Sequence, residues 1–294
     1  MGRLGIIGGS GLYDLPGFTG SGAVPGRQPF GEPSAPLVCG LLAGQELAFL
    51  PRHGPGHRLP PSAINYRANI DSLKRAGVTD VLSVGACGSL REDVPPGTFV
   101  IVDQFIDRTA RRENSFFGEG CVAHVSMADP VCSRLGDHVE AVLKALSIPC
   151  LRGGTYLVME GPQFSTRAES RLYRQWGADV IGMTNMHEAR LAREAEICFA
   201  TEAMVTDFDC WDENRAAVDV GSVLGIMNRN VAQARVMIAA LAERLGGQRP
   251  DSCPHGCDRA LDMALVTAPE QRHDDMRGRL DAVAGRVLGI SCEP

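Results

Sequence analysis

Two acids follow an apolar run in the second half of the chain. Residues 197–205 read as a buried strand, and Asp207 and Asp209 come directly after it. If the strand continues, the two-residue side-chain period puts both carboxylates on one face and turns Phe208 the other way. Ligands of α/β sheets bind at the carboxyl ends of strands. Two acceptors there suit a donor-rich planar edge, such as that of N7-protonated adenine; the alternative is a solvated turn with two ordinary acids.

A glycine-rich turn follows the first predicted strand. Residues 4–8 are short and apolar, and the turn at residues 8–11 lets backbone amides converge on an anion beside the Ser10 hydroxyl. A plain turn is the alternative. The dinucleotide fingerprint Gly-x-Gly-x-x-Gly is incomplete because Asp14 holds its third glycine position, which argues against a nicotinamide enzyme.

Two further strands end in residues that suit an anion. The strand predicted at residues 46–50 leads to Arg52 and His53, which offer a planar fork of donors and one more donor for an oxyanion. The strand at residues 78–84 leads into the small residues 85–89, where a ligand can approach the backbone closely. A surface charge cluster and tight strand-on-helix packing are the respective alternatives.

The elements that must position these groups follow from periodicity and from breaker residues. Further strands are predicted at residues 37–42, 99–105, 155–159 and 178–183, and helices at residues 60–75, 130–146, 187–196 and 220–245. Thr166 and Glu169 fit a capping box at the start of another helix. Phe164, just before it, either stacks on a planar base or staples that helix.

Composition and charge narrow the class of protein. The chain has 294 residues and no compositional break, which favours one large domain. A formal net charge of −6 gives no electrostatic footprint for nucleic acid or an anionic membrane. No apolar run approaches the roughly 18 residues of a membrane helix, and the N-terminus does not resemble a signal peptide. The ten cysteines lie mostly in apolar runs, so we expect buried thiols in a reducing, cytoplasmic compartment.

Two features of the sequence carry weaker expectations. Cys253 and Cys257 form one pair without a second pair, so we predict no metal site and leave a disulfide or two free thiols open. His124 lies in the polar, irregular residues 107–127, where a lone histidine is most often structural.

Six motifs in order resemble one known family. Together they are similar to the 5′-methylthioadenosine phosphorylases, the trimeric branch of the purine nucleoside phosphorylase family, over about residues 3 to 245. The motifs are residues 5–12, 51–54, 86–90, 103–108, 160–165 and 206–211. The resemblance implies an α/β fold: a single domain over residues 1–294 with a central twisted mixed sheet flanked by helices, and a helical C-terminal extension at about 253–290. It also implies a homotrimer without metal or organic cofactor.

The same resemblance implies a reaction and a set of site residues. The reaction is phosphorolysis of 5′-methylthioadenosine to adenine and 5-methylthioribose 1-phosphate. The implied phosphate site is Ser10, Arg52, His53, Gly85, Ala86 and Thr184. The implied nucleoside site is Met183 under the ribose, Phe164 against the purine, Asp207 and Asp209 at the adenine edge, and His57, Val220, Val223 and Leu224 around the methylthio group, with His124 from a neighbouring subunit. Ser165 and Val220 match the family's specificity positions.

The chain departs from the animal enzymes at four places. Ser10 stands where they have Thr, Gly85 replaces a hydroxyl residue, and His187 replaces a residue that is often Pro in the loop after Thr184. The tail beyond about residue 248 does not match them. One phosphate contact is therefore expected to come from backbone alone, and the closure of the methylthio pocket stays open.

The chemistry agrees with these roles. Cleaving the ribose–adenine bond builds positive charge on the sugar, which phosphate stabilises and then captures, and negative charge on the purine. Asp207 is the predicted acid that donates to N7, and this requires its pKa to rise by roughly two or three units from about 3.9. Burial and the like charge of Asp209 both act in that direction. The alternatives are a 5′-methylthioinosine or 6-oxopurine nucleoside phosphorylase, a hydrolytic nucleosidase and a non-catalytic nucleoside-binding protein.

Overall fold

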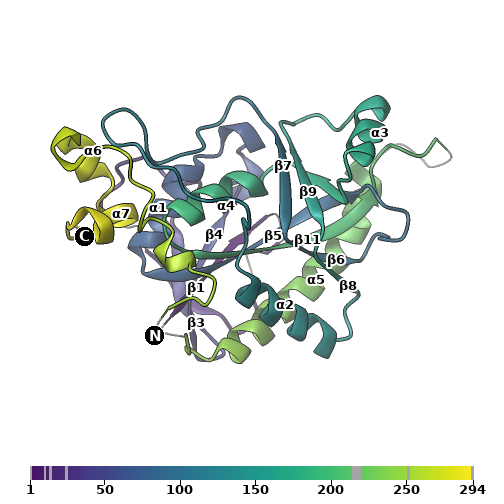
Figure 1. The fold of residues 1–294 in the computed structure, drawn as a ribbon. Coiled ribbons are helices and arrows are strands. Elements are labelled where there is room, and N and C mark those ends of the chain that lie inside the picture. Colours follow the sequence, from purple (N-terminus) through teal and green to yellow (C-terminus); the bar gives the residue numbers. More distant parts are fainter. Residues whose placement is uncertain are drawn as a thin grey trace.

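A mixed β-sheet runs through the centre of the chain, with helices on both of its faces (Figure 1). The computed structural model describes residues 2–9, 11–12, 15–23, 26–213, 220–249 and 252–292. The strands in this part of the chain are β1 Arg3–Gly8, β2 Thr19–Ala23, β3 Leu37–Leu42, β4 Gln45–Pro51, β5 Val78–Ser89, β6 Phe99–Val102, β7 Gln104–Arg108, β8 Cys150–Arg152, β9 Thr155–Met159, β10 Val180–Gly182 and β11 Cys198–Phe208.

The α-helices alternate with these strands until the C-terminal tail. They are α1 Tyr66–Arg75, α2 Ser133–Ala145, α3 Arg167–Gln175, α4 Asn185–Glu194, α5 Val220–Leu245, α6 Asp274–Arg279 and α7 Asp281–Leu288. Short 3₁₀ turns lie at Pro55–His57, Pro61–Ala63, Cys257–Arg259 and Pro269–Gln271. No helix of the described residues has the length and apolar character needed to cross a membrane.

Strand β5 is the axis of the sheet. It pairs in parallel with β1 on one side and with β11 on the other, and β4 continues the parallel set beyond β1. At its end β5 also pairs antiparallel with β10, through Ser89 and Gly88. The carboxyl ends of β1, β4, β5 and β11 therefore meet at one edge, which is the edge where α/β sheets bind ligands.

Apolar side chains bury both faces of the sheet. Helices α2 and α5 cover one face through residues such as Leu135, Val139 and Leu241. Helices α1, α4 and α7 cover the other face through residues such as Ile70 and Leu191. The predicted α/β fold with a mixed sheet between helical layers is confirmed.

Several predicted boundaries shift because local hydrogen bonds override the periodicity. The helix predicted from residue 60 begins at Tyr66, because Asn65 accepts from the Ala68 amide at 3.1 Å and caps it there. The helix predicted from residue 130 begins at Ser133. The strand predicted at residues 99–105 is broken at Asp103 into β6 and β7.

Other predicted elements agree with the structure. Helix α5 has the predicted bounds, and Thr166 and Glu169 form the predicted capping box at the start of α3. The C-terminal tail carries the short helices α6 and α7, drawn in yellow in Figure 1, with much irregular chain around them. Strands β2 and β8 are additional to the prediction.

One carboxyl group is buried inside the sheet without a partner. Glu202 lies in β11, opposite Val84 and Ile101, and its side chain is fully buried. Neither of its oxygens has a hydrogen-bond partner in the described structure. Burial raises the pKa of Glu202 well above its usual range, because the charged form is poorly solvated there.

The buried Glu202 should make stability depend on pH. The pKa of Glu202 is higher in the folded than in the unfolded protein, so the contribution of this group to the free energy of unfolding is fully present below the unfolded pKa of about 4.3. As the pH rises toward the folded pKa, the free energy of unfolding falls by up to about 1.4 kcal/mol per pH unit. Glu202→Gln removes this titration. In denaturant titrations from pH 4.5 to 8 at fixed protein concentration, the variant should gain unfolding free energy relative to the wild type as pH rises. A constant difference would contradict the assignment.

Candidate active site

A cavity of about 620 Å³ opens where the carboxyl ends of β4, β5, β10 and β11 meet. Most of the site residues that the sequence predicts line it: Arg52, His53, His57, Gly85, Ala86, Phe164, Met183, Thr184, Asp207, Asp209 and Leu224. Ser10 lies outside the described residues, and so do the side chains of Val220 and Val223.

One end of the cavity holds a buried guanidinium. Arg52 is only 1% exposed, and its Nη1 donates to the Val84 carbonyl at 3.0 Å. Gly9 and Gly85 flank this nitrogen. A Cβ added at Gly9 would lie 3.7 Å from it, and one added at Gly85 would lie 3.4 Å from it. The second N–H of Nη1 has no acceptor among the described residues, so this corner is suited to an anion.

A carboxylate holds Arg52 in place. Glu188 in α4 accepts from Arg52 Nε and, at 3.2 Å, from Nη2, while Nη2 also donates to Ser83 Oγ at 2.6 Å. Burial alone would lower the pKa of Arg52, but the charge and hydrogen bonds of Glu188 raise it. The guanidinium is therefore charged and fixed in orientation. Sequence reasoning missed Glu188 and Ser83, and the polar Ser83 within an apolar strand was the signal available.

The same network reaches the N-terminus of α4. Asn185 donates to Thr201 Oγ1 at 2.5 Å and to Ser83 Oγ at 3.3 Å, and Thr184 Oγ1 donates to Asn185 Oδ1 at 3.2 Å. Thr184 is the residue before the first turn of α4. Free amides and the helix dipole at such a terminus favour a bound anion.

A pair of stacked histidines forms the neighbouring wall. The rings of His53 and His57 lie 4.0 Å apart and nearly parallel. His53 Nδ1 lies 2.9 Å from the Leu59 carbonyl, which only accepts, so Nδ1 carries the proton and Nε2 is free to accept one. Burial and the charge of Arg52 lower the pKa of His53 to about 4, so the ring is neutral near pH 7.

The opposite end of the cavity holds the two acids. A β-bulge after Val205 shifts the pairing of β11 with β5, so that Asp207 lies opposite Gly88. A Cβ added at Gly88 would lie 3.0 Å from Asp207 Oδ1. A larger residue at position 88 would therefore crowd the Asp207 carboxylate. Asp207 and Asp209 both line the cavity, while Phe208 packs edge-to-face on Trp211, so the predicted division of faces is confirmed.

The environment of the acids favours their protonated forms. Burial raises the pKa of Asp207 to about 6, Asp209 adds to the rise, and a 2.7 Å bond from Thr206 Oγ1 opposes it. Burial also raises the pKa of Asp209, whose Oδ2 has no hydrogen-bond partner in the described structure. The sequence predicted both causes for Asp207, and the shift has the size that donation near neutral pH requires.

The two ends are separated by a short stretch of β5. Gly85 lies at the guanidinium and Gly88 at the acid pair, three residues or about 10 Å along a strand. Ala86 and Cys87 between them also line the cavity, with Met183 nearby and Phe164 at the rim, where its side chain is 51% exposed. The space has room for a planar base at the acids, a sugar in the middle and an anion at Arg52.

Three predicted positions lie elsewhere. His124 is exposed outside its own chain's cavity, and its amide donates to the Ala264 carbonyl at 2.9 Å. Ser165 lies beside the cavity without lining it, and its hydroxyl faces Met159 Sδ at 3.6 Å. His187 is inside the first turn of α4 rather than in a loop, because that helix begins directly after Thr184.

Several lining residues were not predicted. They come mainly from turns and strand ends around the cavity and include Gly9, Pro60, Pro61, Met159, Pro162, Ile181, Thr206 and Met227. The expectation that Cys253 and Cys257 have no second cysteine pair is wrong in space, because Cys132 and Cys198 lie beside them. All ten cysteines fall within the described residues, and none of them forms a disulfide.

Known proteins are similar to this chain over nearly its whole length. Residues 3–244 match the model of the phosphorylase superfamily. The chain is 60% identical, over 97% of its length and 98% of the relative, to an S-methyl-5′-thioadenosine phosphorylase of Bradyrhizobium diazoefficiens. It resembles the crystal structure of a methylthioadenosine phosphorylase from an Antarctic soil metagenomic library, with TM-score 0.89 and 46% identity over 96% of this chain and 98% of that one.

A second solved structure carries a bound base. The methylthioadenosine phosphorylase of Schistosoma mansoni in complex with adenine has TM-score 0.86 and 36% identity to this chain. The match covers 90% of this chain and 99% of that enzyme.

The raised pKa of Asp207 can be measured without any ligand. Its carboxyl carbon, followed by ¹³C NMR in protein labelled at aspartate, should titrate near pH 6 rather than near 4, because the group is buried beside a second acid. Asp209→Asn should lower this pKa by removing the like charge, and Asp207→Asn should abolish the resonance. A midpoint near pH 4 in the wild type would show that burial does not hold the proton.

Proposed function

The chain belongs to the phosphorylase superfamily, and on that premise we propose that it cleaves S-methyl-5′-thioadenosine with phosphate. The products are adenine and 5-methylthioribose 1-phosphate. The observation that carries this proposal is the pairing, in one cavity, of the anion corner at Arg52 with the acid pair at the other end of the glycine stretch of β5. Relatives up to 60% identical over nearly the whole chain bear the name of this activity.

The acids act on the base. Asp207, protonated, gives its proton to N7 of the purine as the bond between C1′ and N9 breaks, so adenine leaves neutral. Asp209, ionised, accepts from the N6 amino group. Its Oδ2 has no other partner in the described structure, which supports this role.

Phosphate is the nucleophile. Its oxygens bind Arg52 Nη1, the hydroxyl of Thr184, the amides at the start of α4 and the backbone at Gly9, Gly85 and Ala86. Neutral His53 accepts a hydrogen bond at Nε2 from the P–OH group of hydrogen phosphate, which keeps its proton. One phosphate oxygen then bonds to C1′ on the face opposite the departing base. The family resemblance adds the Ser10 hydroxyl to this site, although Ser10 lies outside the described residues.

The remaining residues hold the sugar and the methylthio group. Met183 lies under the ribose, and its carbonyl accepts from Arg112 at 2.6 Å, which fixes the segment. His57 and Leu224, which line the cavity, contact the methylthio group, and Phe164 covers the purine. The family resemblance adds Val220 and Val223 to this pocket and makes Ser165 and Val220 specificity positions; the side chains of Val220 and Val223 lie outside the described residues. A proton donor, an acceptor and a phosphate site supply the whole reaction, so it needs no organic cofactor.

Product analysis with and without phosphate tests the reaction itself. We expect adenine and a sugar phosphate to form in equal amounts only when phosphate is present. Adenine with free 5-methylthioribose in phosphate-free buffer would indicate a nucleosidase instead. Tight binding of the nucleoside with no turnover under either condition would indicate a non-catalytic binding protein.

Arg52→Ala should raise the KM for phosphate far more than the KM for the nucleoside. Loss of one charge-assisted hydrogen bond is worth about 1.5–3 kcal/mol, so the phosphate KM should rise by about 10- to 150-fold. Steady-state kinetics with each substrate varied give the two KM values. The matched control is Arg58→Ala, which removes an arginine from the same cavity that bonds to the Ser34 carbonyl. Equal effects of Arg52→Ala on both substrates would count against the phosphate assignment.

The two acids should decide which base is accepted. Asp207→Asn should lose most activity on S-methyl-5′-thioadenosine, because an amide cannot complete the proton transfer. Asn at both 207 and 209 offers donors to a 6-oxo group, and sites built on a specific hydrogen bond discriminate by up to about 10⁴-fold. The double variant should therefore shift kcat/KM toward 5′-methylthioinosine, while Asp212→Asn, outside the cavity lining, should not. An unchanged ratio in the double variant would mean that these acids do not read the base.

We also propose a homotrimer with His124 contributing to a neighbour's site. Support comes from apolar side chains around His124: Met263 is 97% exposed, Val266 62% and Val122 37%. Hydrogen bonds hold these segments together, from the Val266 amide to the Val122 carbonyl at 2.9 Å and from His124 to Ala264. Such a patch, on two segments joined by the isolated β-bridge between Ala123 and Leu265, fits a subunit contact.

Sedimentation tests the assembly. At micromolar concentration we expect one species near three times the 31.4 kDa chain mass. Met263→Asp should dissociate the trimer and lower its activity at the same time, and a fully active monomer would refute the shared site.

A cytoplasmic location is a further proposal. It is supported by ten cysteines without a disulfide, and cell fractionation would test it.

A further inference from the structure

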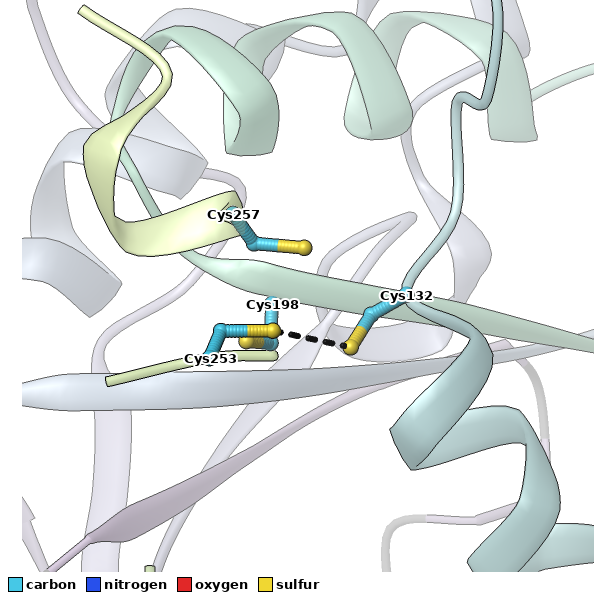
Figure 2. A group of neighbouring side chains, drawn as sticks. All are labelled: Cys132, Cys198, Cys253 and Cys257. Atoms are coloured by element: carbon cyan, nitrogen blue, oxygen red, sulfur yellow. Dashed lines mark hydrogen bonds between the residues drawn. The ribbon is translucent and has the colours of Figure 1, made fainter. Parts of the chain in front are cut away.

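Four cysteines from three distant parts of the chain converge (Figure 2). They meet at the amino end of β11, whereas the active-site cavity lies at the carboxyl end of that strand. Cys132 directly precedes α2, Cys198 is the first residue of β11, and Cys253 and Cys257 flank a Pro-His-Gly turn in the tail. Their Sγ atoms all lie within 4.8 Å of one another. All four side chains are buried, with exposures of 1%, 0%, 5% and 2% in that order.

The spacing of the sulfurs fits a single tetrahedral metal ion. Zinc–sulfur bonds of about 2.3 Å place the four sulfurs of a tetrahedron about 3.8 Å apart. Cys132 Sγ and Cys253 Sγ are 3.7 Å apart, whereas a disulfide requires about 2.05 Å. We propose that Cys132, Cys198, Cys253 and Cys257 bind one Zn²⁺ as a closed structural site.

Backbone contacts hold the ligands in position. The Cys132 amide donates to the Phe199 carbonyl at 2.7 Å, which ties this ligand to the strand that carries Cys198. In the tail, the Cys253 amide donates to both carboxylate oxygens of Asp258, at 3.1 and 3.0 Å. Gly256 has φ +66°, a left-handed conformation in the turn between Cys253 and Cys257.

The charges around the cluster complement a tetrathiolate. Binding converts four thiols and Zn²⁺ into a zinc tetrathiolate of charge −2 and releases four protons. Arg249 Nη2 lies 3.8 Å from Cys198 Sγ and donates toward it. Arg249 and Arg134 both pair with Asp80, which brings two guanidinium groups to the Cys198 side of the site, while the Asp258 carboxylate lies on the Cys253 side. Donors to the sulfur atoms of this kind stabilise bound thiolates.

A surface cavity lies beside the site. Its volume is about 480 Å³, and it is lined by Ser133, next to Cys132, and by His255 and Gly256 within the ligand turn, but by none of the four cysteines. Four sulfur ligands leave no open position on the metal, and none of them lines the active-site cavity, so the ion is structural.

The site attaches the tail to the core. Cys253 and Cys257 lie beyond residue 244, where the superfamily match ends, while Cys132 and Cys198 lie inside it. Beyond the cluster, the Leu261 amide donates to Glu196 at 2.9 Å, and Leu265 forms a β-bridge with Ala123. Zinc would therefore hold the tail in place where it supports the segment that carries His124.

Metal analysis of the untagged, full-length protein tests the proposal. After purification without chelators, mass spectrometry of the elements should find one zinc per chain. Titration with a mercurial reagent under native conditions should release that zinc as the cluster thiols react. Cys253→Ser and Cys257→Ser should each lower the zinc content well below one. The matched control is Cys121→Ser, which changes a fully buried cysteine outside the cluster and should leave one zinc bound.

Cobalt provides a test that needs no variant. Protein in which zinc is exchanged for Co²⁺ should show the strong visible bands and the thiolate-to-metal charge transfer of a tetrahedral sulfur site.

Chelation should lower the Tm of the wild type and of Cys121→Ser but not that of Cys257→Ser. Folded protein with substoichiometric metal, whether its cluster thiols are free or joined as a disulfide with a mass 2 Da lower, would overturn the site. Stoichiometric iron in place of zinc would overturn the choice of metal.

Discussion

The buried ion pair between Arg52 and Glu188 is the constraint on which the site depends. Desolvating two charges costs several kcal/mol per ion unless the geometry and the additional hydrogen bonds are good. Here Glu188 binds the guanidinium at two nitrogens, and Ser83 and the Val84 carbonyl satisfy two further donors. The pair joins the end of β4 to β5 and α4. Removing one partner would leave an unpaired charge in the core. The same substitution would therefore disrupt both the anion corner and the packing of these elements.

The electrostatics of the cavity change along β5. At Gly85 a fixed positive charge favours anions, and at Gly88 burial and the like charge of Asp209 raise the pKa of Asp207 to about 6, so that it can donate a proton near neutral pH. The reaction needs opposite properties at its two ends: negative charge held against the sugar and a proton delivered to the base. Placing both on one strand, about 10 Å apart, sets their distance by backbone geometry rather than by flexible side chains. The glycine at position 88 matters because a Cβ there would lie only 3.0 Å from Asp207 Oδ1.

The C-terminal tail is joined to this core by polar and sulfur contacts as well as apolar packing. Leu280 and Val283 pack beside α1 and α4, and Arg286 forms an ion pair with Glu196. The cysteine cluster adds a connection at the other end of the tail, to α2 and β11. A tetrathiolate site would stabilise this attachment more than the short helices α6 and α7 alone, because helices of one or two turns have little intrinsic stability.

The sequence by itself determined the α/β character, the bounds of α5, and the identity of most cavity-lining residues, including Asp207 and Arg52. These follow from local signals: apolar periodicity, strand ends, caps and short motifs. Only the tertiary structure decided that Glu188 holds Arg52 and that Asp207 is buried enough to raise its pKa to about 6. It also decided that Cys253 and Cys257 meet Cys132 and Cys198. Each of these depends on contacts across more than fifty residues of chain, or on the loss of water around a group, and neither is encoded in the neighbouring residues.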